Sequence, residues 1–182
     1  MKLTLIFAII CTSSISAADI RGTSESILVN YFGRDARLAF SVYDIPDENK
    51  TSIEQAVQQR FFREKVHLWV ISKNDSTIAI AVLDNVLGKA MPITFLVVFD
   101  GSGTIILTEI IRYREAIGGE ISNSGWLKQF KGYSSKQSRD LDSQVDGISG
   151  ATISVNSVTQ GVEKLCLLFP HMKASLEKSS RE

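Results

Sequence analysis

A run of small residues that leads directly into an amphipathic segment constrains this chain most. The run reads Asp-Gly-Ile-Ser-Gly-Ala-Thr over residues 146–152. Apolar residues then recur every three or four positions from Ser154 to Leu168, which is typical of a helix with one buried face. A glycine-rich approach leaves backbone N–H groups free at a helix start, and the helix dipole there favours an anion. The pattern therefore predicts a C-terminal helix that begins either at a phosphate site or at an ordinary tight turn.

The same run resembles the target sequence of bacterial flavin transferases, Asp-x-x-Ser-Gly-Ala-Thr. In the FMN-binding domain family, this enzyme joins FMN through its phosphate to the threonine hydroxyl. The family includes the flavin subunits of sodium-pumping NADH:quinone reductases and of Rnf complexes. The matching residues are Asp146, Ser149, Gly150, Ala151 and Thr152. The resemblance implies that Thr152 carries covalent FMN.

Four further segments, in the same order, resemble small exported proteins made of one FMN-binding domain. They are residues 88–95, 113–115, 118–121 and 126–132. The resemblance is most specific over residues 88–168. It implies maturation by a flavin transferase and electron exchange with redox partner proteins that are themselves membrane-bound.

The resemblance also singles out residues around the loop that follows the expected last strand. Gly118 and Gly119 either let the backbone approach a ligand closely or form an ordinary bend. Glu115 and Glu120 flank this loop, and either hydrogen-bond the flavin ring edge or belong to a solvated surface.

Two other side chains have competing interpretations. Trp126 either stacks on the flavin ring or covers the edge of the core, and its helical spacing to Phe130 favours the core. Lys89 either balances the phosphate charge or is an ordinary exposed lysine.

The N-terminus predicts export to the periplasm. Lys2 is a minimal positive region, residues 3–11 are apolar, and Ser16-Ala17-Ala18 predicts cleavage before Asp19. Residues 1–18 are therefore expected to be a signal peptide, and lipidation at Cys11 is the alternative. Cleavage would leave Cys166 without a disulfide partner, as a small buried hydrophobe rather than a reactive thiol.

The composition predicts one globular domain over residues 19–172, followed by a charged segment, 173–182, that forms a frayed helix end or a tail. Twenty basic residues balance twenty acidic ones, without a basic run, which argues against nucleic acid as a partner. His67 and His171 have no partner at metal-ligand spacing, so no metal site is expected.

Strand-like runs with short turns between them predict an antiparallel meander. The expected strands are residues 36–43, 66–72, 77–87, 92–100 and 104–112. The expected helices are residues 23–32, 51–62, 126–130 and 154–168, the second opened by a capping box at Thr51–Glu54. Residues 116–125 are expected to be a loop and residues 132–145 to be irregular. The predicted class is α+β, an antiparallel sheet with helices packed on it.

The sequence shows neither a nicotinamide-binding glycine pattern nor a catalytic triad beside the implied covalent flavin. It therefore predicts an electron-transfer protein rather than a stand-alone enzyme. Two alternatives remain open from the sequence. One is a small flavin-dependent reductase that acts directly on a soluble acceptor. The other is a flavin-free binding module of the same fold.

Overall fold

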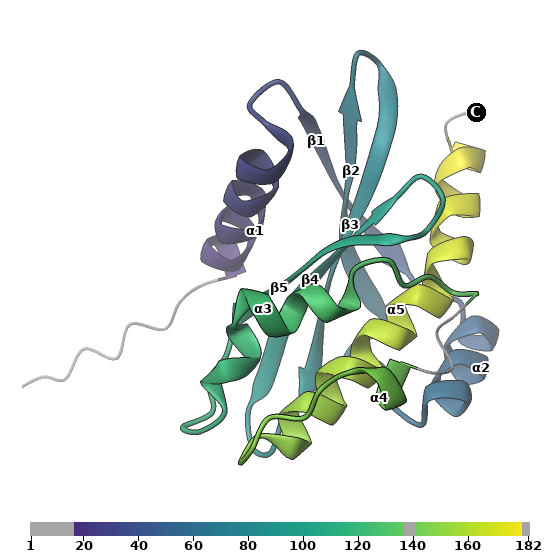
Figure 1. Cartoon of the computed structure of the whole chain (residues 1–182). Helices are drawn as coiled ribbons and strands as arrows, with labels where there is room; N and C mark the ends of the chain where they lie inside the picture. The colour runs from purple at the N-terminus through teal and green to yellow at the C-terminus, as the bar shows by residue number, and fades with distance from the viewer. Residues whose placement is uncertain (1–16, 137–140, 180–182) are drawn as a thin grey trace, which may run out of the picture.

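The computed structural model describes residues 17–136 and 141–179, and these form a five-stranded sheet covered by helices (Figure 1). The strands lie side by side in chain order, and each pairs antiparallel with the next. They are β1 (Arg37–Asp44), β2 (Lys65–Lys73), β3 (Ser76–Leu87), β4 (Pro92–Asp100) and β5 (Ile105–Arg112). The predicted meander and the α+β class are confirmed.

Short turns with left-handed backbone set the meander. Asn74 and Asp75 both have positive φ, 48° and 58°, as a two-residue hairpin between twisted strands requires. In the next hairpin, Gly103 has φ 86°, and Asp100 Oδ1 accepts hydrogen bonds from the backbone N–H groups of Ser102 and Thr104. Both turns coincide with those predicted from the sequence.

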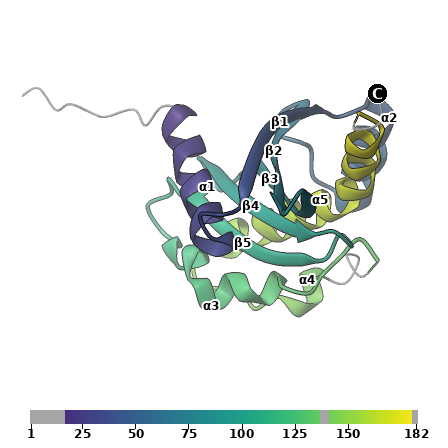
Figure 2. The ribbon, with the colours of Figure 1, turned by 90° about the horizontal axis from the view of Figure 1, so that it is seen from above.

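Helices cover the two faces of the sheet unequally. The long helix α5 (Thr152–Ser179) and α2 (Asp47–Val57) pack on one face, and α1 (Ala17–Phe32) packs on the other (Figures 1 and 2). Strand residues alternate between the two cores, so Val82 faces α5 while Ala81 belongs to the cluster around Leu28 of α1.

Short helical turns fill the connection between β5 and α5. They are η1 (Gly119–Ser122), α3 (Ser124–Leu127), η2 (Lys128–Phe130) and α4 (Leu141–Gln144). The predicted loop 116–125 and the predicted irregular segment 132–145 thus each contain a helical turn. Buried Ile121 and Leu141 anchor these turns in the core, and neither lies in a periodic run long enough to predict a helix.

The first helix begins earlier than predicted. The sequence predicted a helix that starts at Thr23 with this residue or Ser24 near its cap, but α1 starts at Ala17 and both residues lie within it. The Ser24 hydroxyl is buried and donates to the Ile20 carbonyl one turn back, so it bonds inside the helix instead of capping it. Residues 1–16, which hold most of the predicted signal peptide, lie outside the described residues.

The capping-box prediction for the second helix is also wrong. The helix begins at Asp47, four residues before Thr51, and ends at Val57, before Phe62. Pro46 fixes the approach with φ −58°, and the acidic side chains of Asp47 and Glu48 suit the helix N-terminus. Glu54, expected to complete the capping box, accepts a hydrogen bond from the Phe61 N–H instead, at 2.7 Å.

The last helix runs from Thr152 to Ser179, so it starts two residues before its predicted range and continues eleven residues past Leu168. Pro170 lies inside it, where a proline normally ends a helix because it lacks an N–H. Packing explains the continuation, since Met172 is fully buried and Lys173 Nζ donates to the Gly101 carbonyl at 2.9 Å. No helix in the described part of the chain is both long and apolar enough to cross a membrane.

Candidate functional site

The predicted attachment residue, Thr152, is the first residue of α5 and is exposed. Gly150 precedes it with φ 79°, a left-handed conformation that suits glycine. Ala151 between them is buried, its N–H donates to the Ile148 carbonyl, and its carbonyl accepts from the Val155 N–H. The motif thus holds the backbone in place while the Thr152 side chain faces solvent. The N–H groups of the first helical turn lack intrahelical partners, which favours an anion beside Thr152.

The structure brings the predicted loop against this motif. A Cβ built on Gly118 would lie 2.7 Å from Ala151 Cβ and 2.8 Å from the Tyr113 hydroxyl. Gly118 also has φ 88°. A glycine is therefore required here by contact between two protein segments. Gly119 differs, because a Cβ built there meets nothing within 4 Å.

A tyrosine joins the two segments. The Tyr113 hydroxyl donates to the Ile117 carbonyl in the loop and lies 3.1 Å from Ser154 Oγ in the first turn of α5. In the sequence, Tyr113 was identified only within the segment 113–115 that resembles the FMN-binding family, and no role was predicted for it. No local pattern marks a tyrosine whose partners lie four and 41 residues away.

A shallow, open depression of about 660 Å³ lies along the loop. Its walls come from Ala116, Ile117, Gly118, Gly119, Glu120, Ser122 and Asn123. Because Gly118 contacts Ala151, this depression lies next to the residue that precedes Thr152. The exposed side chain of Glu120 is at its wall, free to face a ligand.

Trp126 and Asp146 are brought together through the backbone of Asp146. Trp126 Nε1 donates to the Asp146 carbonyl at 2.8 Å, and the Asp146 N–H donates to Gln129 Oε1 at 2.9 Å. Trp126 is only 7% exposed, and its ring packs edge-to-face on Phe130. Its structural effect is to fix the start of the motif and leave the Asp146 side chain exposed. Gln129 was missed by sequence reasoning.

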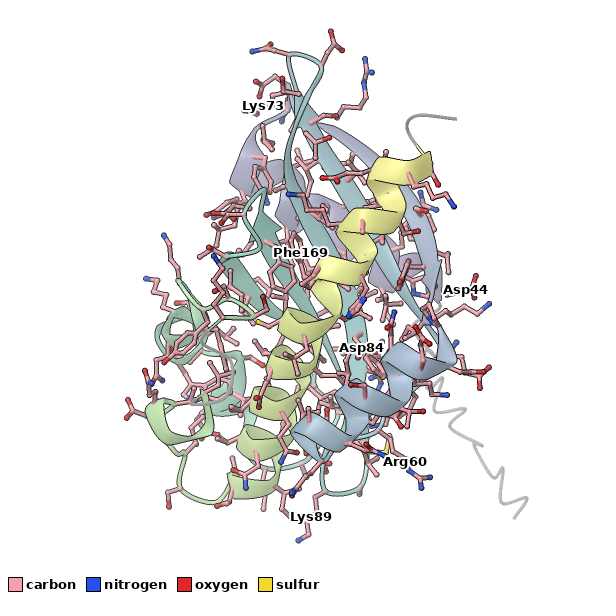
Figure 3. The ribbon with its side chains drawn as sticks, turned by 90° about the vertical axis from the view of Figure 1, so that its right-hand side faces the viewer. Asp44, Arg60, Lys73, Asp84, Lys89 and Phe169 are labelled. Carbon is pink, nitrogen blue, oxygen red and sulfur yellow. The ribbon has the colours of Figure 1, made fainter. Side chains whose placement is uncertain are left out.

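Glu115 and Lys89 lie at the turn between β3 and β4. Glu115 Oε1 accepts from the N–H groups of Ala90 and Met91, at 2.8 and 3.0 Å, and these bonds lower the pKa of its carboxyl group. The carboxylate therefore braces the turn, and this oxygen already has partners. Lys89 is exposed at the end of the molecule where α5 begins (Figure 3).

Two other groups with polar or reactive chemistry are buried away from Thr152. Cys166 is 1% exposed, and burial, with the nearby Glu163 charge, raises the pKa of its thiol to about 12, so it is a protonated core residue. Lys164 of α5 and Asp84 of β3 form a buried ion pair, at 3.3 Å, and Figure 3 labels Asp84. Sequence reasoning missed this pair. Among the described residues, no group of three or more His, Cys, Asp or Glu side chains is placed to hold a metal ion.

Residues 88–166 match the family model of the FMN-binding domain. Over this segment, the chain is similar to the FMN-binding domain family. The matched segment runs from the β3–β4 turn, through β4, β5 and the loop, into α5, so it contains the loop and the Thr152 motif described above. No match to the chain was found among curated proteins.

Proposed function

We propose that this protein carries FMN on Thr152 through a phosphoester bond and serves as an electron-transfer protein in the periplasm. One observation carries the proposal. Within the segment that matches the FMN-binding domain, Thr152 is exposed at the first position of a 28-residue helix. Gly150, two residues before it, has a left-handed backbone conformation that turns the chain into the helix. A modifying enzyme can reach such a hydroxyl, and the helix N-terminus stabilises the attached phosphate.

The residues present suit the remainder of the cofactor. The depression along residues 116–123 offers room for a flat ring beside Ala151, with Gly119 and Glu120 at its wall. Ile117 and Ile153 are apolar yet 73% and 51% exposed, and a ring lying over them would remove that surface from water. When bound, FMN supplies the redox chemistry, while these residues set its position and its access to solvent.

The shape of the depression favours electron transfer to another protein over catalysis on a small substrate. Small-molecule sites usually enclose most of the ligand, whereas this depression is shallow and open. A flavin ring held in this depression keeps one side accessible to a redox partner. We propose that this partner is a membrane-bound protein. A flavin transferase is the proposed maturation partner. The periplasmic location rests on the predicted signal peptide, residues 1–18, and N-terminal sequencing of the mature protein should begin at Asp19.

The attachment is tested by making the protein with a bacterial flavin transferase, Mg²⁺ and FAD. The wild type should give a fluorescent band on a denaturing gel and an intact mass raised by one FMN less a water. Thr152→Ala should lose both signals and Thr152→Ser should retain some attachment. Ser175→Ala is the matched control, because it removes another exposed hydroxyl of α5 that lies outside the motif. Covalent flavin that persists in Thr152→Ala would place the bond elsewhere and refute the assignment.

The role of the loaded protein is tested separately. A carrier should accept and release electrons reversibly in a potentiometric titration, and should turn over small soluble acceptors only slowly without a protein partner. Rapid steady-state turnover of a soluble acceptor would favour the reductase alternative. A protein that stays colourless after treatment with the transferase would favour the flavin-free module.

A further inference from the structure

A second cavity lies on the other face of the sheet from α5. It has a volume of about 530 Å³, which is within the usual range for small-molecule sites. Its walls come from α1, from β1 to β4 and from the segments that follow α2 and β5. Arg114 lines this cavity, while Tyr113, its neighbour in the chain, contacts Ser154 of α5. The cavity and the Thr152 site therefore flank the same end of β5 on opposite faces.

Positive charge dominates the walls. The charged or titratable side chains there are Arg21, Arg63, Lys65, His67, Asp84 and Arg114. The single carboxylate among them, Asp84, is 3% exposed and pairs with Lys164.

The cations of this cavity differ in their partners. Arg21 pairs with Glu25, and Lys65 lies 3.7 Å from Asp44. Arg63 and Arg114 have no carboxylate partner within residues 17–136 and 141–179, and Arg114 Nη1 donates only to the Pro92 carbonyl. Two guanidinium groups thus remain available to an anion.

Burial first, and neighbouring positive charge second, lower the pKa of two groups that line this cavity. Burial and the charge of Arg112 lower the pKa of Arg114. Burial, Arg63 and Lys65 lower the pKa of His67. Like charges close together disfavour the protonated form of each group, and a bound anion would offset this repulsion.

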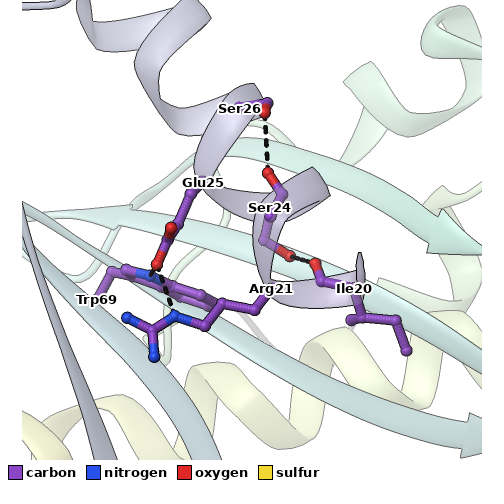
Figure 4. A network of polar contacts seen from close by, with 7 residues as sticks. Ile20, Arg21, Ser24, Glu25, Ser26 and Trp69 are labelled. Carbon is purple, nitrogen blue, oxygen red and sulfur yellow. Dashed lines mark hydrogen bonds and ion pairs between the residues drawn. The ribbon is translucent and has the colours of Figure 1, made fainter. Parts of the chain in front are cut away.

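Aromatic rings form an apolar wall beside the charges. Phe62 is 43% exposed, and Phe40 stacks on His67 with ring centroids 5.7 Å apart. The Arg21 guanidinium lies 4.0 Å from the Phe40 ring centroid. Glu25 fixes this guanidinium and also accepts a hydrogen bond from Trp69 Nε1 (Figure 4), so the wall is held in place before any ligand binds.

We propose that this cavity is a second binding site, for a small aromatic acid whose ring contacts Phe40 and Phe62 and whose acidic group pairs with Arg63 and Arg114. The chemistry follows from the walls, because a planar guanidinium matches a carboxylate, sulfonate or phosphate and an exposed ring favours a flat apolar partner. The site does not use Thr152, so it does not depend on flavin attachment.

The probe for this site is anilinonaphthalene sulfonate, an aromatic acid that becomes fluorescent when bound. Its uncharged analogue, phenylnaphthylamine, keeps the rings and lacks the sulfonate. The sulfonate should bind more tightly than the analogue, and added salt should weaken it. Arg63→Gln and Arg114→Gln should each weaken the sulfonate about tenfold or more, as expected for loss of a charge-assisted hydrogen bond, and leave the analogue unchanged.

The matched control is Lys178→Gln, which removes an exposed cation far along α5 and should not change binding of either probe. Circular dichroism checks that each variant is folded. Binding should also persist in flavin-free Thr152→Ala, which separates this site from the proposed flavin site. Equal affinity for the two probes, or unchanged sulfonate affinity in the folded Arg63→Gln/Arg114→Gln double variant, would overturn the proposal.

Discussion

The Tyr113 hydroxyl lies 3.1 Å from Ser154 Oγ while it donates a hydrogen bond to the Ile117 carbonyl. These bonds join three parts of the site: the segment after β5, the glycine loop and the first turn of α5. Ser154 is buried and lies two residues after Thr152, the proposed attachment residue, so the position of the loop relative to Thr152 depends on this contact.

Tyr113→Phe should keep the ring packing and lose both hydrogen bonds. We expect the free energy of unfolding to fall by about 1 kcal/mol, because the buried Ser154 hydroxyl loses a partner. Amide hydrogen exchange over residues 116–120 should become faster. Urea denaturation and hydrogen-exchange mass spectrometry measure the two effects. Tyr31→Phe is the control, since the Tyr31 hydroxyl is exposed and donates to the Ile106 carbonyl at 3.3 Å. Unchanged exchange in the loop of Tyr113→Phe would contradict the role assigned to this contact.

The geometry separates two glycines that the sequence treated alike. Gly118→Ala should reduce the free energy of unfolding by about 1–3 kcal/mol, because the added methyl group would meet Ala151 on a backbone with positive φ. Gly119→Ala should change it by less than about 0.5 kcal/mol, because its Cβ would meet open space. Urea denaturation of the two variants measures the difference, and equal losses would contradict it.

Flavin readouts complete this comparison. In the loaded protein, a folded Gly119→Val variant should shift the flavin reduction potential or fluorescence, because the added side chain lies at the wall of the depression. Unchanged flavin properties in Gly119→Val would remove this part of the loop from the site.

The bounds of an element were predictable where the local sequence pattern and the burial of its side chains favour the same secondary structure. Strand β4 has the predicted bounds, Pro92–Asp100, because a run that is apolar except for Thr94 lies between two turns. The capping box at Thr51 failed because a proline and two acidic residues upstream offered an earlier helix start. The helix end at Leu168 failed because Met172 packs in the core and offsets the cost of Pro170.

The site was predictable only in part, for a different reason. The motif around Thr152 is contiguous, so its place at a helix start could be read locally. The contact between Gly118 and Ala151, and the bond from Trp126 to Asp146, join residues 33 and 20 positions apart by their numbers. Such contacts depend on how β5, α3 and α5 pack together. Local sequence patterns therefore do not predict these two contacts.

Mutations of the buried pair Asp84–Lys164 should have strongly non-additive effects on the free energy of unfolding. Burial raises the pKa of Asp84 and lowers that of Lys164, so desolvation outweighs their attraction in both groups. Lys164→Met alone leaves a buried carboxylate without its cation and should cost about 3–5 kcal/mol of unfolding free energy. Asp84→Leu alone should cost a similar amount. The double variant should regain most of the stability, because a well-packed apolar pair avoids desolvation of charges. Additive losses in urea denaturation of all three variants would refute this account.

His67 predicts a loss of stability in mild acid. Burial, then Arg63 and Lys65, lower its folded pKa below the ordinary value of 6.5, and only Asp84 opposes them. The unfolded chain therefore takes up a proton at this residue before the folded protein does, and stability should fall as the pH drops below about 6.5. His67→Gln removes this contribution, so its urea midpoint should fall less than that of the wild type between neutral pH and mild acid. His171→Gln is the matched control, because His171 is exposed on α5. Parallel midpoint curves for wild type and His67→Gln across this interval would show that His67 titrates alike in the folded and unfolded states.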